Sequence, residues 1–130
     1  MFTTRILPRV SETDAAGHIN NVFVSVWFEA GRREIFRILN PDLDFLAWRA
    51  VIVNINVDYE NQLFFAHEVE IRTWVKEIGN RSFKVGEEIW QQNQRCASGT
   101  AVYVYFNPST QSAESIPVNV ADKLRKQLID

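Results

Sequence analysis

The stretch Thr13–Asn21, TDAAGHINN, places several chemically capable side chains in a short segment. An aspartate with an ordinary pKa near ~3.9 is ionised at neutral pH, so Asp14 can act as a general base or as a nucleophile. Gly17 lets the backbone approach a ligand closely. The segment directly precedes an apolar helical pattern, and the N–H groups at a helix start suit a developing oxyanion. The sequence therefore predicts a carboxylate and peptide donors facing one carbonyl group.

The same residue types also have a purely structural use. Asp, Asn and Gly are favoured in tight turns and at helix N-caps, so Asp14 taken alone is more often a turn residue than a catalyst. We expect Asn20 and Asn21 first to cap the helix and shape the loop, and second to contact substrate. His18 has two possible roles: it can form a hydrogen bond that holds the loop, or it can contact substrate.

A helix from Val22 to about Leu39 must position this segment. Its apolar residues return at spacings of three and four, which predicts one broad buried face. They are Phe23, Val24, Trp27, Phe28, Ile35, Ile38 and Leu39. Asn40-Pro41 ends the helix, because a residue before proline is steered away from the α region. Glu29, Arg32 and Arg33 lie at helical spacings and are expected to form ion pairs on the surface or between subunits.

Alternation with a period of two predicts that the rest of the chain is mainly β-structure. The expected strands are 4–10, 51–59, 69–76, 83–89 and 96–106, and a closing helix spans 118–129. Gly79-Asn80 marks a hairpin turn between the third and fourth of these strands. Pro8 cannot donate to a sheet, so the first strand should be an edge or contain a bulge.

Composition limits the class of protein. The chain has 130 residues, 46% of them hydrophobic, and we expect one domain over residues 1–130. Fourteen basic and sixteen acidic residues form no long block of one sign, which argues against a nucleic-acid interface. The sequence shows no signal peptide and no apolar run of about 20 residues, so we expect no membrane span and a cytoplasmic location. The single cysteine, Cys96, is expected in the core.

The order of elements and the loop sequence together resemble a known family. SETDAAGHINNVFVSVWFEAGR resembles the signature of the hotdog-fold acyl-CoA thioesterases that are similar to 4-hydroxybenzoyl-CoA thioesterase. The resemblance rests on Asp14, Gly17, His18, Asn20, Asn21, Phe28 and Glu29. It implies an α+β hotdog fold, in which an antiparallel sheet of about five strands wraps around one long central helix and a C-terminal helix follows.

The resemblance also implies an activity, namely hydrolysis of an acyl-CoA thioester to the free acid and CoA. Asp14 occupies the position of the family's catalytic acid, which attacks the carbonyl or activates water. The resemblance therefore favours a catalytic role for Asp14 over a role in the turn alone. The amides around Gly17 to Asn21, including those of His18 and Asn20, would bind the oxyanion. The resemblance implies no metal and no redox cofactor. Coenzyme A is part of the substrate and not a cofactor of the protein.

The segment GNRSFKV resembles a family segment near the thioester end or the pantetheine channel. This implies that Ser82 faces the site of a neighbouring subunit and that Arg81 or Lys84 meets a CoA phosphate. Tyr59, like Trp27 and Phe28, is expected first in the core, with substrate contact as its second role. His18, His67 and Cys96 lack the spacing of metal ligands. Val24 stands where the family often has tyrosine, which leaves the acyl specificity open.

Two other functions are compatible with the same fold. Hotdog hydratases have their histidine five places after the acid, whereas His18 follows Asp14 by four and no Asn-Pro lies between them. A non-catalytic protein that binds acyl-CoA or an acyl carrier is the other alternative. The strand 96–106 is apolar on both faces, so something beyond the central helix must cover it. We therefore expect a homo-oligomer, with a tetramer favoured over a dimer.

Overall fold

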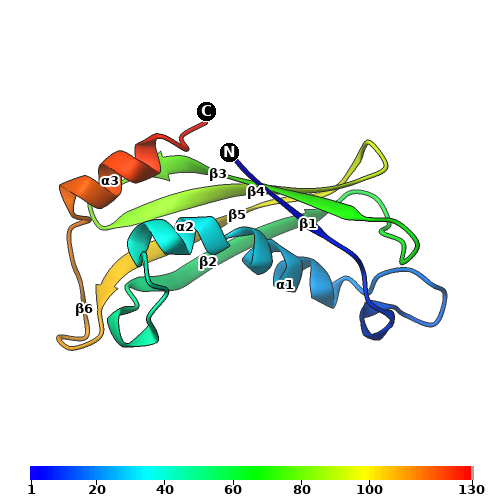
Figure 1. The fold of residues 1–130 in the computed structure, drawn as a ribbon, viewed down its shortest axis with the longest axis horizontal. Helices are drawn as coiled ribbons and strands as arrows, with labels where there is room; N and C mark the ends of the chain where they lie inside the picture. Colours follow the sequence, from blue (N-terminus) through cyan, green and yellow to red (C-terminus); the bar gives the residue numbers. More distant parts are fainter. Residues whose placement is uncertain (130) are drawn as a thin grey trace.

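The computed structural model describes residues 1–129, and Figure 1 shows a curled sheet with helices along one face. The sheet strands are β1 (Phe2–Ile6), β2 (Ala50–Tyr59), β3 (Val69–Ile78), β4 (Ser82–Gln91), β5 (Gln94–Asn107) and the short β6 (Ser112–Ala113). The helices are α1 (Val22–Gly31), α2 (Arg33–Leu39) and α3 (Val118–Arg125), with 3-10 turns at Val10–Glu12 (η1) and Phe45–Ala47 (η2). Within residues 1–129 no helix combines the length and apolar character needed to span a bilayer.

The sheet is antiparallel, with the strand order β1-β3-β4-β5-β2 and β6 paired to β5. Alternation places one face of β3 and β4 under the helices, where Val75 pairs with Val85 and both are fully buried. This curled antiparallel sheet with a C-terminal helix confirms the general hotdog architecture. Strand β2 forms one edge, and its residues from Val51 to Asn56 are all exposed.

The expectation of one long central helix was wrong, because the helix is interrupted at Arg32. Arg32 has φ −83° and ψ −2°, and its N–H donates to Glu29 O at 3.0 Å, so the chain makes a tight turn between α1 and α2. The Arg32 side chain is only 2% exposed and pairs with Glu87 of β4. Beside it, Gly31 packs so closely on β3 that an added Cβ would lie 2.6 Å from Ile71 Cγ2.

The interruption coincides with a buried polar layer that divides the core. Thr73, Glu87 and Gly99 lie in one row across β3, β4 and β5, because Thr73 pairs with Glu87 and Glu87 pairs with Gly99. Arg32 contacts this row from the helix side. The apolar cluster on one side of this layer lies under α1 and includes Trp27, Phe28, Ile71, Ile89 and Cys96. The cluster on the other side lies under α2 and α3 and includes Ile35, Val85, Tyr103 and Leu124.

Several sequence-based boundaries needed correction. Strand β1 ends at Ile6 rather than Val10, since the chain leaves the sheet before Pro8 and forms η1. Helix α3 ends at Arg125 rather than Ile129, and it packs on α2 and β3. Core positions were predicted correctly for Trp27, Phe28 and Cys96, which are at most 2% exposed, but wrongly for Tyr59, which is 53% exposed at the end of the edge strand.

Candidate active site

The Asp14 loop is a small closed turn on the surface. The Asp14 N–H donates to His18 O at 2.8 Å, and Asp14 Oδ1 accepts hydrogen bonds from the amides of Ala16 at 2.8 Å and His18 at 3.2 Å. Gly17 completes the turn with φ +79°, a conformation that favours glycine. Asp14 is exposed, and none of the hydrogen bonds among residues 1–129 uses its Oδ2. The carboxylate is therefore oriented through one oxygen and accessible at the other.

The loop is fastened to the segment that follows β2. The Ile19 N–H donates to Leu63 O at 2.8 Å, and His18 and Phe64 form an isolated β-bridge. The ring of His18 packs edge-on against Phe64, with 5.1 Å between ring centroids. In the described chain the His18 backbone thus holds the loop, while its side chain packs against an aromatic ring.

The start of α1 leaves some peptide donors unused. Asn20 acts as the capping side chain, because its Oδ1 accepts from the Val22 N–H at 3.0 Å, whereas Asn21 occupies the N-cap position without a side-chain cap. The amides of His18, Ile19 and Asn20 are engaged by other acceptors. Of the five amides from residue 17 to residue 21, only those of Gly17 and Asn21 have no acceptor within residues 1–129. The candidate oxyanion donors therefore reduce to these two.

Beneath the loop lies a buried acid that the sequence analysis did not single out. Glu12 is 2% exposed and accepts hydrogen bonds from Arg9 and from the indole of Trp27. Burial alone would raise the pKa of Glu12, but the hydrogen bonds from Arg9 and Trp27 bring it below its usual value. Glu12 is therefore a carboxylate at neutral pH. The only signal in the sequence was its position two residues before Asp14.

A groove of about 610 Å³ runs along the outer side of α1 and α2, next to β2. Its lining is largely apolar and aromatic, and it comprises Val26, Glu29, Ala30, Arg33, Phe36, Phe45, Trp48, Ala50, Ile52 and Tyr103. Grooves of this size and character bind small organic groups. Sequence reasoning missed it because its walls come from two helices, a 3-10 turn and two strands, and these elements extend along the chain from Val26 to Tyr103.

The buried ion pair under this groove corrects the expectation for Arg32. Instead of a surface pair with Glu29, Arg32 donates from Nε and Nη2 to the two oxygens of Glu87 at 2.8 and 2.6 Å, and from Nη1 to the Tyr103 hydroxyl at 3.1 Å. Burial raises the pKa of Glu87, although Arg32 opposes this shift. Burial alone would lower the pKa of Arg32, but Glu87 raises it. The pair is saturated and leaves no free group for chemistry.

Ser82 and Lys84 lie far from Asp14 within one chain. Ser82 begins β4, whereas Gln91, at the other end of that strand, contacts the segment next to the Asp14 loop. The ends of this ten-residue strand are nine residue steps apart, which is roughly 30 Å. Lys84 lies 3.7 Å from Glu77, and Arg81 is exposed at the hairpin turn. A single chain therefore does not bring this group to Asp14.

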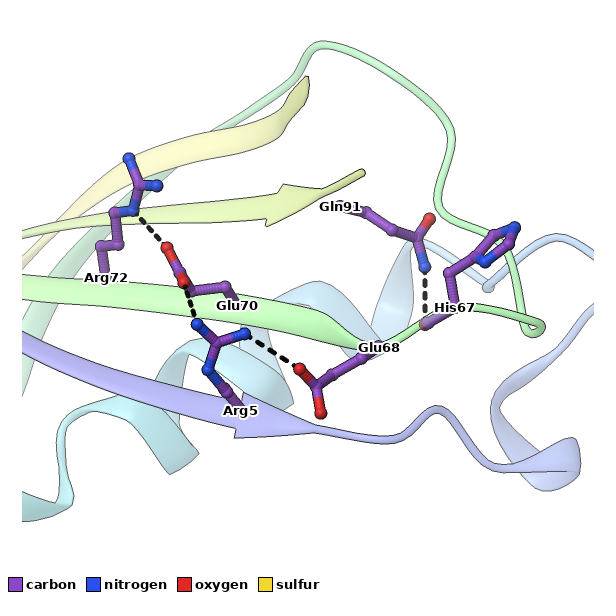
Figure 2. Close-up of polar contacts among 6 residues, drawn as sticks. All are labelled: Arg5, His67, Glu68, Glu70, Arg72 and Gln91. Carbon is purple, nitrogen blue, oxygen red and sulfur yellow. Dashed lines mark hydrogen bonds and ion pairs between the residues drawn. The ribbon is translucent and has the colours of Figure 1, made fainter. Parts of the chain in front are cut away.

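Figure 2 shows how the segment after β2 is held and what lies beside it. The Gln91 carboxamide donates to the carbonyls of Phe64 and His67 at 2.8 and 2.9 Å. On the outer face of β1 and β3, alternating charges form a chain of ion pairs at 2.6 to 3.0 Å through Arg5, Glu68, Glu70 and Arg72. These charges satisfy one another. In the described part of the chain, no three His, Cys, Asp or Glu residues are grouped to hold a metal ion.

The fold and the loop agree with the comparison to known families. Residues 8–127 match the model of the thioesterase-like superfamily, which is most of the chain. The chain belongs to this superfamily and is a thioester hydrolase, which confirms the sequence-based assignment to the hotdog thioesterases. A predicted thioesterase from Bacillus stearothermophilus is 50% identical and superimposes with a TM-score of 0.97, over 99% of this chain and 97% of that chain.

More distant relatives extend the comparison. The uncharacterized protein YsmA of Bacillus subtilis (strain 168) is 28% identical over 117 residues, which are 88% of this chain and 78% of YsmA. A thioesterase from Thermus thermophilus, solved in complex with coenzyme A and Zn, is 21% identical with a TM-score of 0.87, over 97% of this chain and 92% of that chain. A Staphylococcus aureus DHNA-CoA thioesterase is 20% identical with a TM-score of 0.82, over 96% and 91% of the two chains. These last two share the fold.

Proposed function

We propose that this protein hydrolyses an acyl-CoA thioester to the free acid and CoA, with Asp14 as its catalytic group. The observation that carries the proposal is the arrangement of the loop. An exposed carboxylate is oriented through Oδ1 by two amides, and its Oδ2 accepts no hydrogen bond within residues 1–129. In the same loop, which leads into α1, the Gly17 and Asn21 amides also have no acceptor within these residues. A carboxylate and two free N–H groups are the components that thioester hydrolysis needs.

In the proposed reaction, the thioester carbonyl oxygen accepts hydrogen bonds from the Gly17 and Asn21 amides. Attack on the carbonyl carbon places negative charge on that oxygen, and the partial positive charge of the α1 start stabilises it. Asp14 Oδ2 either takes a proton from the attacking water or attacks the carbon itself. The carbon–sulfur bond then breaks and CoA leaves as a thiolate, which is a good leaving group because thiols have pKa values near ~8.5.

The two roles of Asp14 differ in where oxygen from water first appears. In a single turnover in H₂¹⁸O with enzyme in excess, a general base gives acid product that carries the label. A nucleophile forms an acyl-aspartyl anhydride, and attack of water on its aspartyl carbonyl gives unlabelled product and labelled Asp14 in the first turnover. Labelled Asp14 is therefore the outcome that identifies a nucleophile, since attack of water on the acyl carbonyl labels the product as a general base does. Mass spectrometry of product and of the Asp14 peptide distinguishes these outcomes.

CoA is the proposed carrier because solved relatives with this fold include a coenzyme A complex and a DHNA-CoA thioesterase. The groove between α1, α2 and β2 is the proposed acyl site, since Phe36, Trp48 and Tyr103 give it an apolar aromatic wall. A hydrolysis screen over short, long and aromatic acyl-CoAs identifies the acyl group that fits. The proposed reaction needs no metal and no redox cofactor.

A homo-oligomer is the proposed assembly. Edge strand β2 exposes Val51, Ile52, Val53 and Ile55 by 40 to 58%, and its outer backbone groups pair with no strand of the described chain. Antiparallel pairing of two copies of β2 would bury these side chains. It would also bring the Arg81, Ser82 and Lys84 end of one copy toward the Tyr59 and Asp14 end of the other. A second interface on the outer face of the sheet would give a tetramer, and light scattering measures the native mass.

The direct test of the proposed function is release of free CoA by wild type and by Asp14→Asn. The amide keeps the shape and the Oδ1 acceptor but cannot act as a base, so the rate should fall by about 10² to 10⁴. Asp42→Asn is the matched control, because Asp42 is an exposed aspartate in the turn after α2. Equal rates for wild type and Asp14→Asn would refute the assignment of Asp14.

A further inference from the structure

We propose that Glu12 is the positioning residue of this site, fixing the Asp14 loop relative to the start of α1. The inference rests on the proposed role of Asp14 and adds a second carboxylate with a different task. Glu12 ends η1 two residues before Asp14, but it is 2% exposed whereas Asp14 is exposed. The two acids are thus close in the chain and opposite in environment.

Glu12 joins three segments through both its side chain and its backbone. Its Oε1 accepts from the Arg9 N–H at 2.7 Å, and its Oε2 accepts from Trp27 Nε1 at 2.8 Å and from Arg9 Nη2 at 3.1 Å. Its carbonyl oxygen accepts from the Asn20 N–H at 2.9 Å. One residue therefore ties the chain before the loop, the chain after the loop, and the middle of α1 to one another.

Position 12 requires a carboxylate, because each group that hydrogen-bonds to the Glu12 side chain is a donor. A glutamine at this position has nearly the same shape, but its NH₂ group would face either the Arg9 amide or the Trp27 indole. That contact would set donor against donor in a buried place, so the side chain would have to turn and the link would break. Glu12→Gln thus changes the volume of the side chain little, but it breaks a hydrogen bond to Arg9 or to Trp27.

The loop has few other anchors. Between Thr13 and Asn20 only Ile19 is buried, and the segment from Asp14 to Gly17 is fully on the surface. Its orientation therefore depends on Glu12 at its start, on the buried Ile19 side chain, and on the contacts of residues 17–19 with the segment 63–65. Displacing a reacting group by about 1 Å can lower a rate by about 10²-fold, so a broken link at Glu12 should reduce turnover.

The experiment combines Glu12→Gln with Asp14→Asn and measures kcat and KM for CoA release from the best acyl-CoA of the screen. If Glu12 acts through Asp14, Glu12→Gln lowers kcat by about 10- to 100-fold with KM changed less than about twofold, and causes no further loss when Asp14 is already Asn. An equal loss in both backgrounds, or an unchanged kcat in Glu12→Gln, would overturn the proposal.

Two further variants separate positioning from folding. Trp27→Phe keeps the buried ring and removes the indole donor, so it should lower kcat in the same direction as Glu12→Gln, and the two effects should not add. Glu87→Gln alters a buried glutamate outside the loop, and at a temperature where both variants are folded it should keep the wild-type kcat. A kcat loss in Glu87→Gln as large as that in Glu12→Gln would contradict positioning by Glu12.

Failure of the proposed function gives a different pattern. If Asp14→Asn hydrolyses as fast as wild type, the role of Asp14 is refuted, but the link made by Glu12 can still be measured. The amides of Ile19 and Asn20 donate to Leu63 O and Glu12 O only while the loop is held against the rest of the chain, so their hydrogen exchange reports on loop position. Glu12→Gln should accelerate their exchange at least about tenfold. Unchanged exchange would refute the positioning role whatever the outcome for Asp14.

Discussion

Asp14 and Glu87 are both acidic residues held beside the α1–α2 helices, yet their surroundings are opposite. Asp14 lies in an exposed loop, where two backbone amides bind one oxygen and the other oxygen is free within the described chain. Glu87 is fully buried, and both its oxygens accept from the guanidinium of Arg32. A carboxylate suited to chemistry keeps an unused oxygen facing solvent, whereas a carboxylate suited to structure is saturated by a partner of opposite charge.

This contrast predicts that stability and activity depend on different residues. The Arg32–Glu87 pair lies at the interruption between α1 and α2, where it joins the helices to the sheet. The loop contributes little buried area, since Asp14 to Gly17 are all exposed. Substitutions in the polar layer should therefore lower the free energy of unfolding, and those in the loop should lower the rate.

The largest effect is expected for Arg32→Met. This change leaves the Glu87 carboxylate buried without its partner, so the free energy of unfolding should fall by about 3–5 kcal/mol. Urea denaturation at a fixed protein concentration measures the difference.

The control is Arg33→Met, which alters the exposed neighbour and should change stability by less than about 0.5 kcal/mol. Adding Glu87→Leu to Arg32→Met should recover most of the loss, because the pair is then replaced by apolar groups. A loss below about 1 kcal/mol for Arg32→Met alone would mean that the buried pair does not hold the helices to the sheet.

A smaller effect is expected for Gly31→Ala, beside the same pair. The new Cβ would lie 2.6 Å from Ile71 Cγ2 and 2.8 Å from Thr73 Oγ1, so the helix and β3 must move apart. Such overpacking costs about 1–3 kcal/mol, which exceeds the gain of about 1 kcal/mol that alanine brings to an exposed helix position. Thermal unfolding should show a lower Tm than wild type. An unchanged or higher Tm would show that this contact adapts without cost.

The smallest effect is a pH dependence that arises under the loop. The pKa of Glu12 is lowered in the folded protein, because the hydrogen bonds from Arg9 and Trp27 outweigh the opposing effect of burial. Its contribution to stability is therefore complete above the unfolded pKa of about 4.3 and is lost as the pH falls through the lowered folded value. The stability difference between wild type and Glu12→Gln should be constant above about pH 5.5 and should shrink below about pH 4. A difference that stays constant down to about pH 3 would contradict this account.

Most of the sheet could be predicted from the sequence, because alternation is a local property. The alternation from residue 69 to residue 76 and the turn at Gly79-Asn80 gave the hairpin of β3 and β4 nearly in full. The interruption at Arg32 could not be predicted in this way. At the interruption Arg32 turns inward to pair with Glu87, which lies 55 residues further along the chain, while the apolar periodicity of the helix continues across the break.

For the candidate site, too, the sequence predicts what depends on neighbouring residues and not what depends on distant ones. The residue types from Asp14 to Asn21 indicated a carboxylate in a loop that leads into a helix, and Asp14 does lie in an exposed loop before α1, while its catalytic role stays a prediction. Which amides remain free depends on acceptors elsewhere, since Leu63 O takes the Ile19 N–H and Glu12 O takes the Asn20 N–H. Glu12 itself was overlooked because an acid between polar neighbours usually lies in solvent, and only the fold places the Trp27 indole above it.

The polar layer that divides the core also affects how this protein can change during evolution. The Asp14 loop rests on the cluster under α1, through Ile19, Trp27 and Leu63. The groove takes part of its lining from α1, but Ala50 and Tyr103 come from the cluster under α2 and α3. The row of Thr73, Glu87 and Gly99 crosses the sheet between the two clusters and separates them. Mutations at Phe36, Trp48 and Ala50, which pack with the cluster under α2 and α3, can therefore reshape the groove for a new acyl group without altering the cluster under the Asp14 loop.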